Sequence, residues 1–149
     1  MDARLLEKEK KAYVSLYKKD TLSYSLILCA ILAELIYVIM VLDVMPVSYL
    51  MGITVMLNIL ILFALFTCAM KVSVYHKTWA LIAVFLGIYM LVRMFVLVPL
   101  VLKPYSRQTV ITAANIVGGG LLMVAGLISL KRTTIRQKLQ EQLNQSNAN

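Results

Sequence analysis

Four long apolar blocks constrain this chain more than any other feature of its sequence. They span 21–42, 50–70, 79–102 and 110–130, and within them only Glu34 and Arg93 are charged. A helix of about 20 residues, at about 1.5 Å per residue, crosses a hydrocarbon core of about 30 Å. Transmembrane strands would instead show alternating polarity over about ten residues. The sequence therefore predicts an all-α integral membrane protein, a four-transmembrane-helix bundle with spans at 22–42, 50–70, 79–102 and 110–130.

Two polar flanks complete the predicted single membrane domain, 1–149. In residues 1–20, apolar side chains fall roughly on one helical face and lysines on the other. This pattern is typical of an amphipathic helix that binds anionic lipid headgroups at the cytoplasmic leaflet, and a simple topology anchor would show it too. In the cytoplasmic tail, 131–149, apolar residues recur every four positions from Ile135 to Leu143. We therefore expect a helical extension of the last span, with a frayed end.

The distribution of basic residues predicts the orientation of the chain. If both termini are cytoplasmic, two basic residues lie outside, Lys103 and Arg107. Twelve lie inside: Arg4, Lys8, Lys10, Lys11, Lys18, Lys19, Lys71, Lys77, Lys131, Arg132, Arg136 and Lys138. Cytoplasmic loops carry the excess of positive charge in membrane proteins. We therefore predict a multi-pass membrane protein with both termini in the cytoplasm, and we attribute the net charge of +8 to topology rather than to nucleic-acid binding.

Glu34 and Arg93 are predicted to lie at nearly the same depth in the membrane. Counted from the cytoplasmic end of each helix, Glu34 lies about 18 Å in and Arg93 about 21 Å in. The same count places Asn58 at about 18 Å and Asn115 at about 22 Å. These four residues, one from each helix, form a predicted polar layer just outside the midplane. Four further polar residues are close in depth: Tyr37, Tyr89, Thr54 and Thr112.

Two interpretations of this polar layer are open. The guanidinium of Arg93 can bind the Glu34 carboxylate through two hydrogen bonds and still donate to the asparagines. The layer would then be a structural network that fixes the register of the helices. Ionisable residues inside a membrane also mark substrate and proton pathways. In that case Arg93 would bind an anionic group, or Glu34 would exchange a proton.

Small residues in the last span predict close helix packing. Gly118, Gly119 and Gly120 are consecutive there, and Gly126 follows. Glycine lets two membrane helices approach each other closely, either inside one bundle or between two copies. A hinge in the last span is the second interpretation.

The sequence carries no motif of a known catalytic chemistry. It has no glycine-rich phosphate loop, no metal-ligand cluster, and no Ser/His/Asp or Cys/His set on one side of the membrane. The two cysteines, Cys29 and Cys68, lie within predicted helices, and their spacing suggests neither a disulfide nor a metal site. We therefore expect no enzymatic activity, no cofactor, no bound metal and no nucleic-acid partner.

The string AILAE, Ala30–Glu34, resembles the first helix of the small multidrug-resistance transporters. Those proteins also have four helices, and the resemblance implies that Glu34 would exchange protons for cationic drugs. The resemblance covers five residues. The chain departs from that family in its basic N-terminal segment and in Arg93, which would repel a cationic substrate. No function is carried over from the resemblance.

Short loops, basic ends and a small-residue helix together favour one class of function. They indicate a small polytopic membrane subunit, or an accessory or assembly factor, that packs with a membrane partner or with itself. The alternative is a small oligomeric transporter or channel for an anionic or protonatable solute, with Glu34 and Arg93 as its site. A water-filled cavity that reaches these two residues would favour the transporter, and a closed, dry pair would favour the subunit.

Overall fold

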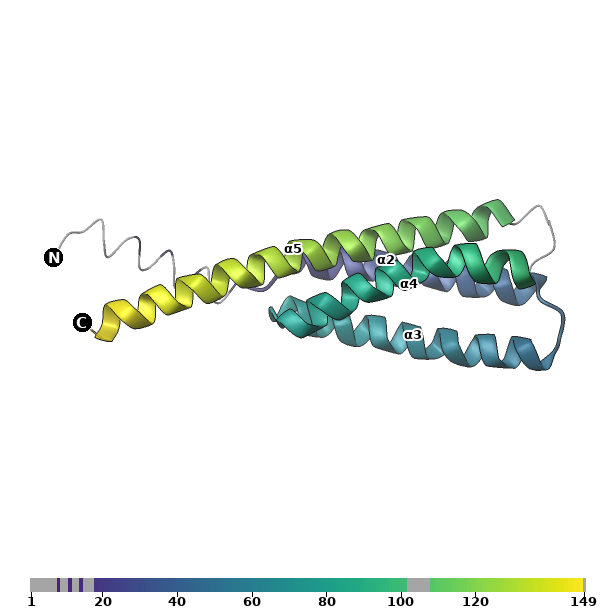
Figure 1. Cartoon of the computed structure of the whole chain (residues 1–149), viewed down its shortest axis with the longest axis horizontal. Coiled ribbons are helices and arrows are strands. Elements are labelled where there is room, and N and C mark those ends of the chain that lie inside the picture. Colours follow the sequence, from purple (N-terminus) through teal and green to yellow (C-terminus); the bar gives the residue numbers. More distant parts are fainter. Residues whose placement is uncertain (1–7, 9–10, 12–13, 15–17, 102–107, 149) are drawn as a thin grey trace.

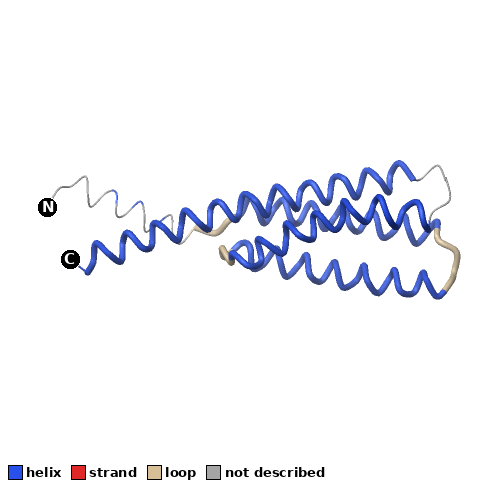
Figure 2. The backbone as a smooth tube through the Cα atoms, viewed as in Figure 1, coloured by secondary structure: helices blue, strands red, loops and turns tan. Residues whose placement is uncertain are grey.

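The computed structural model describes Lys8, Lys11, Val14, 18–101 and 108–148 of the chain. Within this part, four helices, each long and apolar enough to cross a membrane, pack as a bundle (Figure 1). The all-α prediction is therefore confirmed, and helices account for nearly all of the described backbone (Figure 2). The helices are α2 (Thr21–Val44), α3 (Tyr49–Ser73), α4 (Lys77–Val101) and α5 (Gln108–Ala148). The amphipathic helix predicted for 1–20 lies largely outside the described residues.

Successive helices run in opposite directions and pack side by side. Helix α5 lies along α2 and α4, and α3 packs against the same two helices. The connections between α2 and α3 and between α3 and α4 are only a few residues long, as expected for antiparallel neighbours. The four helices therefore surround a common centre.

Polar side chains define where the first two helices begin. Asp20 caps α2: its carboxylate accepts hydrogen bonds from the Ser23 backbone N–H at 3.2 Å and from the Ser23 hydroxyl at 2.7 Å. Ser48 caps α3 and accepts from the Met51 N–H at 3.3 Å. Each cap satisfies a backbone donor that the first helical turn leaves without a partner.

The turn between α3 and α4 holds a tyrosine in a backbone conformation that favours glycine. Tyr75 has φ of 63°. Its N–H donates to the Val72 carbonyl at 3.0 Å, and the His76 N–H donates to the Lys71 carbonyl at 3.3 Å. This is the Schellman pattern of helix ends, in which glycine usually occupies the left-handed position. A side chain at that position costs roughly 1–2 kcal/mol, which contacts of the Tyr75 ring can offset.

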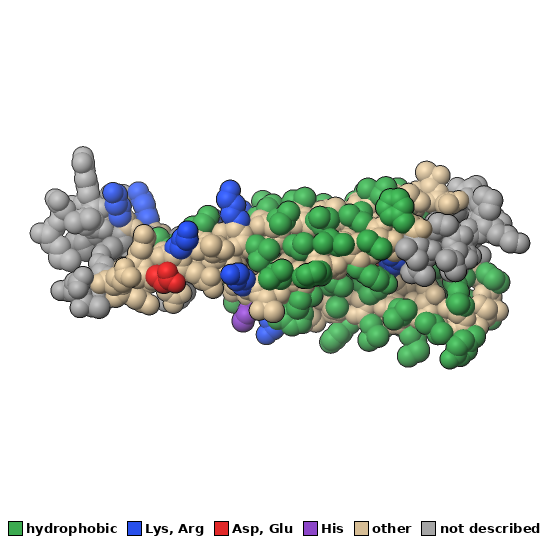
Figure 3. Space-filling view, in the orientation of Figure 1, with side chains coloured by type: hydrophobic (Ala, Val, Ile, Leu, Met, Phe, Trp, Pro, Cys, Tyr) green, Lys and Arg blue, Asp and Glu red, His purple; other side chains and the backbone are tan. Residues whose placement is uncertain are grey.

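One end of the bundle carries most of the described charge, and we call it the basic end. Its cations lie just before α2 (Lys18, Lys19), near the end of α3 (Lys71), at the start of α4 (Lys77) and in the extension of α5 (Lys131, Arg132, Arg136, Lys138). Figure 3 shows most of the Lys and Arg side chains, in blue, towards one end of the molecule. Two contacts join the helices there. Arg132 of α5 forms an ion pair with the fully buried Asp20. Arg136 stacks on the ring of Tyr75, with 3.9 Å from its guanidinium carbon to the ring centroid, and this contact can offset the cost of the turn.

Helix α5 is continuous over 41 residues. At about 1.5 Å per residue it is about 62 Å long, twice the thickness of a hydrocarbon core of about 30 Å. The predicted helical extension is present, but the frayed end is wrong, because the helix continues through Ala148. The tail from Gln137 to Gln142 is rich in Gln, Lys, Leu and Glu, which are strong helix formers.

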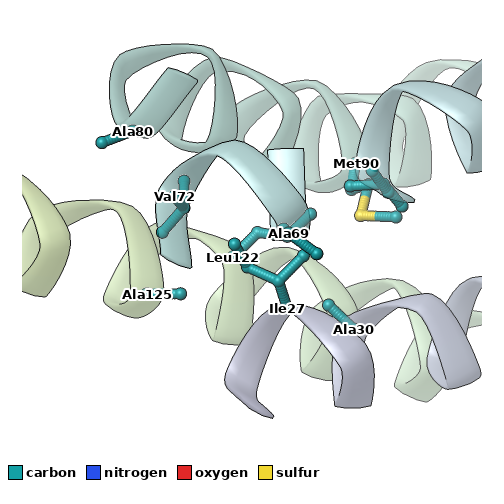
Figure 4. Packing of buried hydrophobic residues seen from close by; sticks show 9 residues of the cluster. Ile27, Ala30, Ala69, Val72, Ala80, Met90, Leu122 and Ala125 are labelled. Carbon is teal, nitrogen blue, oxygen red and sulfur yellow. The ribbon is translucent and has the colours of Figure 1, made fainter. Parts of the chain in front are cut away.

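The polar layer divides the apolar core into two clusters. On its basic-end side lies the larger cluster, most of which Figure 4 labels: Ile27, Ala30, Leu65, Ala69, Val72, Ala80, Met90, Leu122 and Ala125. On the other side lies a smaller cluster: Tyr37, Val41, Met45 and Ile111. Along α2, Glu34 therefore lies between two turns of buried apolar side chains.

Glycines allow α4 and α5 to pack backbone against backbone. A Cβ added at Gly119 would lie 2.9 Å from the Gly87 carbonyl oxygen, and one at Gly126 would lie 2.5 Å from a Val84 methyl group. Gly118 faces α2, where a Cβ would lie 3.3 Å from that of Ala33. Gly120 differs, because apart from its own stretch of α5 no described part of the chain lies within 4 Å of the position that a Cβ would occupy there. Two of the three consecutive glycines thus serve packing inside the chain, and the third points out of the bundle.

Candidate functional site

Arg93 is the centre of a hydrogen-bonded network at the middle of the bundle. Its Nη1 and Nη2 donate to the two carboxylate oxygens of Glu34 at 2.8 and 2.6 Å. Nη1 also donates to Asn58 Oδ1 at 2.9 Å. Asn115 Oδ1 accepts from Nε at 3.2 Å and from Nη2 at 2.6 Å. These five bonds equal the number of N–H groups on a guanidinium, so every donor of Arg93 is used inside the bundle.

The rings of two tyrosines flank the guanidinium of Arg93. Its central carbon lies 3.8 Å from the ring centroid of Tyr37, which is 3 % exposed. The ring of Tyr89 lies farther away, at 5.8 Å, and is 39 % exposed. A cation over an aromatic face is stabilised most when water is excluded. Tyr37 therefore covers one face of Arg93, and Tyr89 lies between the network and the outside of the bundle.

Burial makes this network energetically demanding. Glu34 and Asn115 are each 1 % exposed, Arg93 is 3 % and Asn58 is 4 %. An unpaired charge at such a position costs several kcal/mol, so both charges need each other. The pair is electrically neutral, and the asparagine oxygens satisfy the donors that the carboxylate leaves free.

A second hydrogen bond fixes the orientation of Asn115. Its Nδ2 donates to the Ile111 carbonyl of the preceding turn at 3.0 Å. With Nδ2 held by its own helix, Oδ1 faces Arg93 and accepts both bonds. The amide therefore acts as a rigid acceptor, since rotation by half a turn would break three hydrogen bonds.

The structure brings together the four residues of the predicted polar layer: Glu34, Asn58, Arg93 and Asn115. Tyr37 and Tyr89 also contact Arg93. Thr54 does not join them, because its hydroxyl donates to the Leu50 carbonyl of its own helix at 2.9 Å and is exposed. Among the described residues, Thr112 is not a partner of Arg93 either.

The sequence reasoning missed the residues that join the helices at the basic end. Asp20 was not singled out, although an aspartate directly before an apolar block with Ser23 three positions later is a helix-start signal. Arg132 and Arg136 were counted only as topology signals. No sequence pattern predicts that they meet Asp20 and Tyr75, because those contacts link residues far apart in the chain.

Comparison with known proteins does not assign this chain to a family. No protein-family model, curated protein or solved structure matches it. The chain is a small four-span membrane protein, and its function has to be argued from its own residues.

Proposed function

We propose that this protein is a small membrane subunit or assembly factor, and that the Arg93 network holds its four helices in one register. The observation that carries this proposal is the complete use of the five Arg93 donors by Glu34, Asn58 and Asn115. An anionic solute would have to displace one of these buried partners before it could bind. A buried polar network that links all helices is a recognised way to specify one packing arrangement.

The surface offered to a partner is the half of α3 that begins at Tyr49. The buried residues of α3 are Asn58, Leu65, Cys68, Ala69 and Val72, so the segment Tyr49–Leu57 contributes none. Apart from its own stretch of α3, no described part of the chain lies within 4 Å of the position that a Cβ would occupy at Gly52, which is in this segment. A small residue on an open helix face lets another transmembrane helix approach closely. We therefore propose that a helix of a membrane partner, or of a second copy, packs here.

We also propose that the basic end of the bundle faces the cytoplasm and contacts anionic lipid. Between 18 and 101 and between 108 and 148, every cation except Arg93 lies at the basic end, which supports the placement of that end in the cytoplasm. The basic segment 1–20 would then lie at the anionic headgroups of the same leaflet. We propose no enzymatic activity for this protein.

Crosslinking in the membrane, followed by native co-purification, tests the proposed interface. A photoreactive residue at Met56, which is 69 % exposed, should form an adduct with a protein chain. The matched control is Met70, on the same helix, 52 % exposed and outside the proposed interface; it should form lipid adducts only. Lipid adducts alone at both positions, with a monomer recovered from mild detergent, would contradict the proposal. That result would favour the alternative, a transporter or channel that uses Glu34 and Arg93.

A further inference from the structure

A pocket at the basic end gathers four cationic side chains. The cavity has a volume of about 420 Å³ and is lined by residues at the start of α2, in the turn between α3 and α4 and in the extension of α5. Lys18, Lys19, Arg132 and Arg136 line it. Its volume is within the range of about 300–1,000 Å³ that is usual for small-molecule sites. Asp20, which balances Arg132, is buried and does not line the cavity, so the described wall keeps an excess of positive charge.

Arg136 is held in place at this pocket, and one of its donors has no partner among the described residues. Its guanidinium stacks on Tyr75, which also lines the cavity. Its Nε is buried and has no hydrogen-bond acceptor among the described residues. A stacked, pre-ordered guanidinium loses little conformational freedom when an anion binds it. The turn that contains Tyr75 therefore places its ring against Arg136.

The pocket wall also has an apolar side. Leu22 and Ile135 line the cavity and are 45 % and 58 % exposed. Lys18 and Lys19 come just before Asp20, the cap of α2, and Arg132 is two positions after Leu130, where the last apolar block ends. The cations thus stand where hydrocarbon gives way to water. A free anion gains nothing from apolar neighbours at this depth, whereas a lipid places its acyl chains against them.

We infer that this pocket binds the phosphate headgroup of an anionic phospholipid. The phosphate oxygens accept charge-assisted hydrogen bonds from Arg136, Arg132 and the two lysines, and the first acyl carbons lie against Leu22 and Ile135. The site goes beyond the proposed function, because it requires neither a protein partner nor residues 1–17. Its test and the crosslinking test can therefore fail separately.

Lipid exchange followed by native mass spectrometry tests the site on the full chain. The protein is purified in a neutral detergent and titrated with phosphatidylglycerol or, separately, with phosphatidylcholine. We expect one phosphatidylglycerol to remain bound at a concentration at which phosphatidylcholine does not, since only the former carries a net negative charge. Inorganic phosphate at the same concentration should not compete, because it lacks the acyl chains. Equal retention of the two lipids, or full competition by phosphate, would overturn the inference.

Matched variants separate a built pocket from general attraction to a basic surface. Arg136→Gln should weaken phosphatidylglycerol binding about tenfold, the effect of one lost charge-assisted contact. Lys138→Gln removes the same charge two residues further along α5, outside the pocket lining, and should leave binding within about twofold. If the two variants weaken binding equally, the surface attracts lipid without a specific site.

Tyr75→Gly provides a second variant that does not depend on the charge. Glycine adopts the left-handed conformation of this turn without strain, so the fold should be retained. Loss of the ring frees Arg136, and we expect phosphatidylglycerol binding to fall several-fold while the net charge is unchanged. Wild-type binding by Tyr75→Gly would show that Arg136 is not positioned by the ring, and would overturn that part of the inference.

Discussion

Arg93 on α4 and Glu34 on α2 are 59 positions apart in the chain and face each other through two parallel hydrogen bonds of 2.8 and 2.6 Å. Each side chain is 1 % exposed. The fork-to-fork geometry is the strongest that a guanidinium and a carboxylate can adopt. It makes each residue dependent on the other, and mutations can measure that dependence.

The first prediction concerns this pair. Glu34→Gln and Arg93→Gln should each destabilise the protein by about 3–5 kcal/mol, because each leaves one buried charge without its partner. The double variant leaves two neutral amides that can bond to each other and to Asn58 and Asn115, so it should recover much of the loss. Thermal unfolding of the four proteins in detergent gives the coupling energy.

The outcome of this cycle also separates the two interpretations of the polar layer. A structural pair predicts that the double variant assembles and co-purifies like the wild type. If the layer is a binding site instead, the double variant should fold but should no longer bind or transport a solute. Thr54→Val is the control, since that hydroxyl bonds only to the backbone of its own helix, and it should change little. If the double variant loses as much stability as the two single variants together, Glu34 and Arg93 are not coupled.

The second prediction contrasts two neighbouring glycines of α5. Gly119→Ala should destabilise the bundle by about 1–3 kcal/mol, because the new methyl group would meet the Gly87 carbonyl oxygen at 2.9 Å and force the helices apart. Gly120→Ala should be neutral or slightly stabilising, because its side is open and alanine is the better helix former by about 1 kcal/mol. Unfolding in detergent compares the two. Equal destabilisation would show that Gly120 also packs against a helix, as in a second copy.

The third prediction tests the cap of α2. Asp20→Asn retains an oxygen that can accept from the Ser23 N–H, whereas Asp20→Ala loses it. We expect the alanine variant to be less stable than the asparagine variant by about 1 kcal/mol. Arg132→Gln should also destabilise the protein, because it leaves the fully buried Asp20 carboxylate without its cation, although the 42 % exposure of the Arg132 side chain moderates the loss. Equal stability of the alanine and asparagine variants would show that the side-chain oxygen of residue 20 does not cap α2.

The fourth prediction concerns orientation. In a background with Cys29→Ala and Cys68→Ala, a cysteine at Ser48 should react from outside with a membrane-impermeant reagent. A cysteine at Ser73, at the basic end, should react only after the membrane is permeabilised. This follows from the concentration of Lys and Arg at that end. The opposite labelling pattern would place both termini outside.

The sequence was sufficient to predict the four spans and the polar layer of Glu34, Asn58, Arg93 and Asn115, and the reason is physical. Charge is so rare in the apolar blocks that Glu34 and Arg93 have few possible partners, and helix rise converts position into depth. The sequence did not separate Thr54 from Asn58, because the two lie one turn apart on the same face of α3 and differ in depth by only about 6 Å. Their contacts separate them: the Thr54 hydroxyl donates to the Leu50 carbonyl of its own helix, whereas Asn58 Oδ1 accepts from Arg93. The contacts at the basic end were beyond prediction, since they join residues separated by as many as 112 positions.

The 59-residue separation between Glu34 and Arg93 has a consequence for biosynthesis. A ribosome that adds about 5–20 residues per second needs roughly 3–12 s to proceed from one to the other. During that time the first hairpin, α2 and α3, enters the translocation channel with an acidic residue whose partner has not been made. The helix around Glu34 is strongly apolar, with a mean hydropathy of 2.7 over an 18-residue window of Thr21–Asp43, and this hydrophobicity has to offset the cost of inserting the charge. The arrival of α4 then completes the charge pair, so the nascent chain gains its full membrane stability only when the second hairpin is inserted.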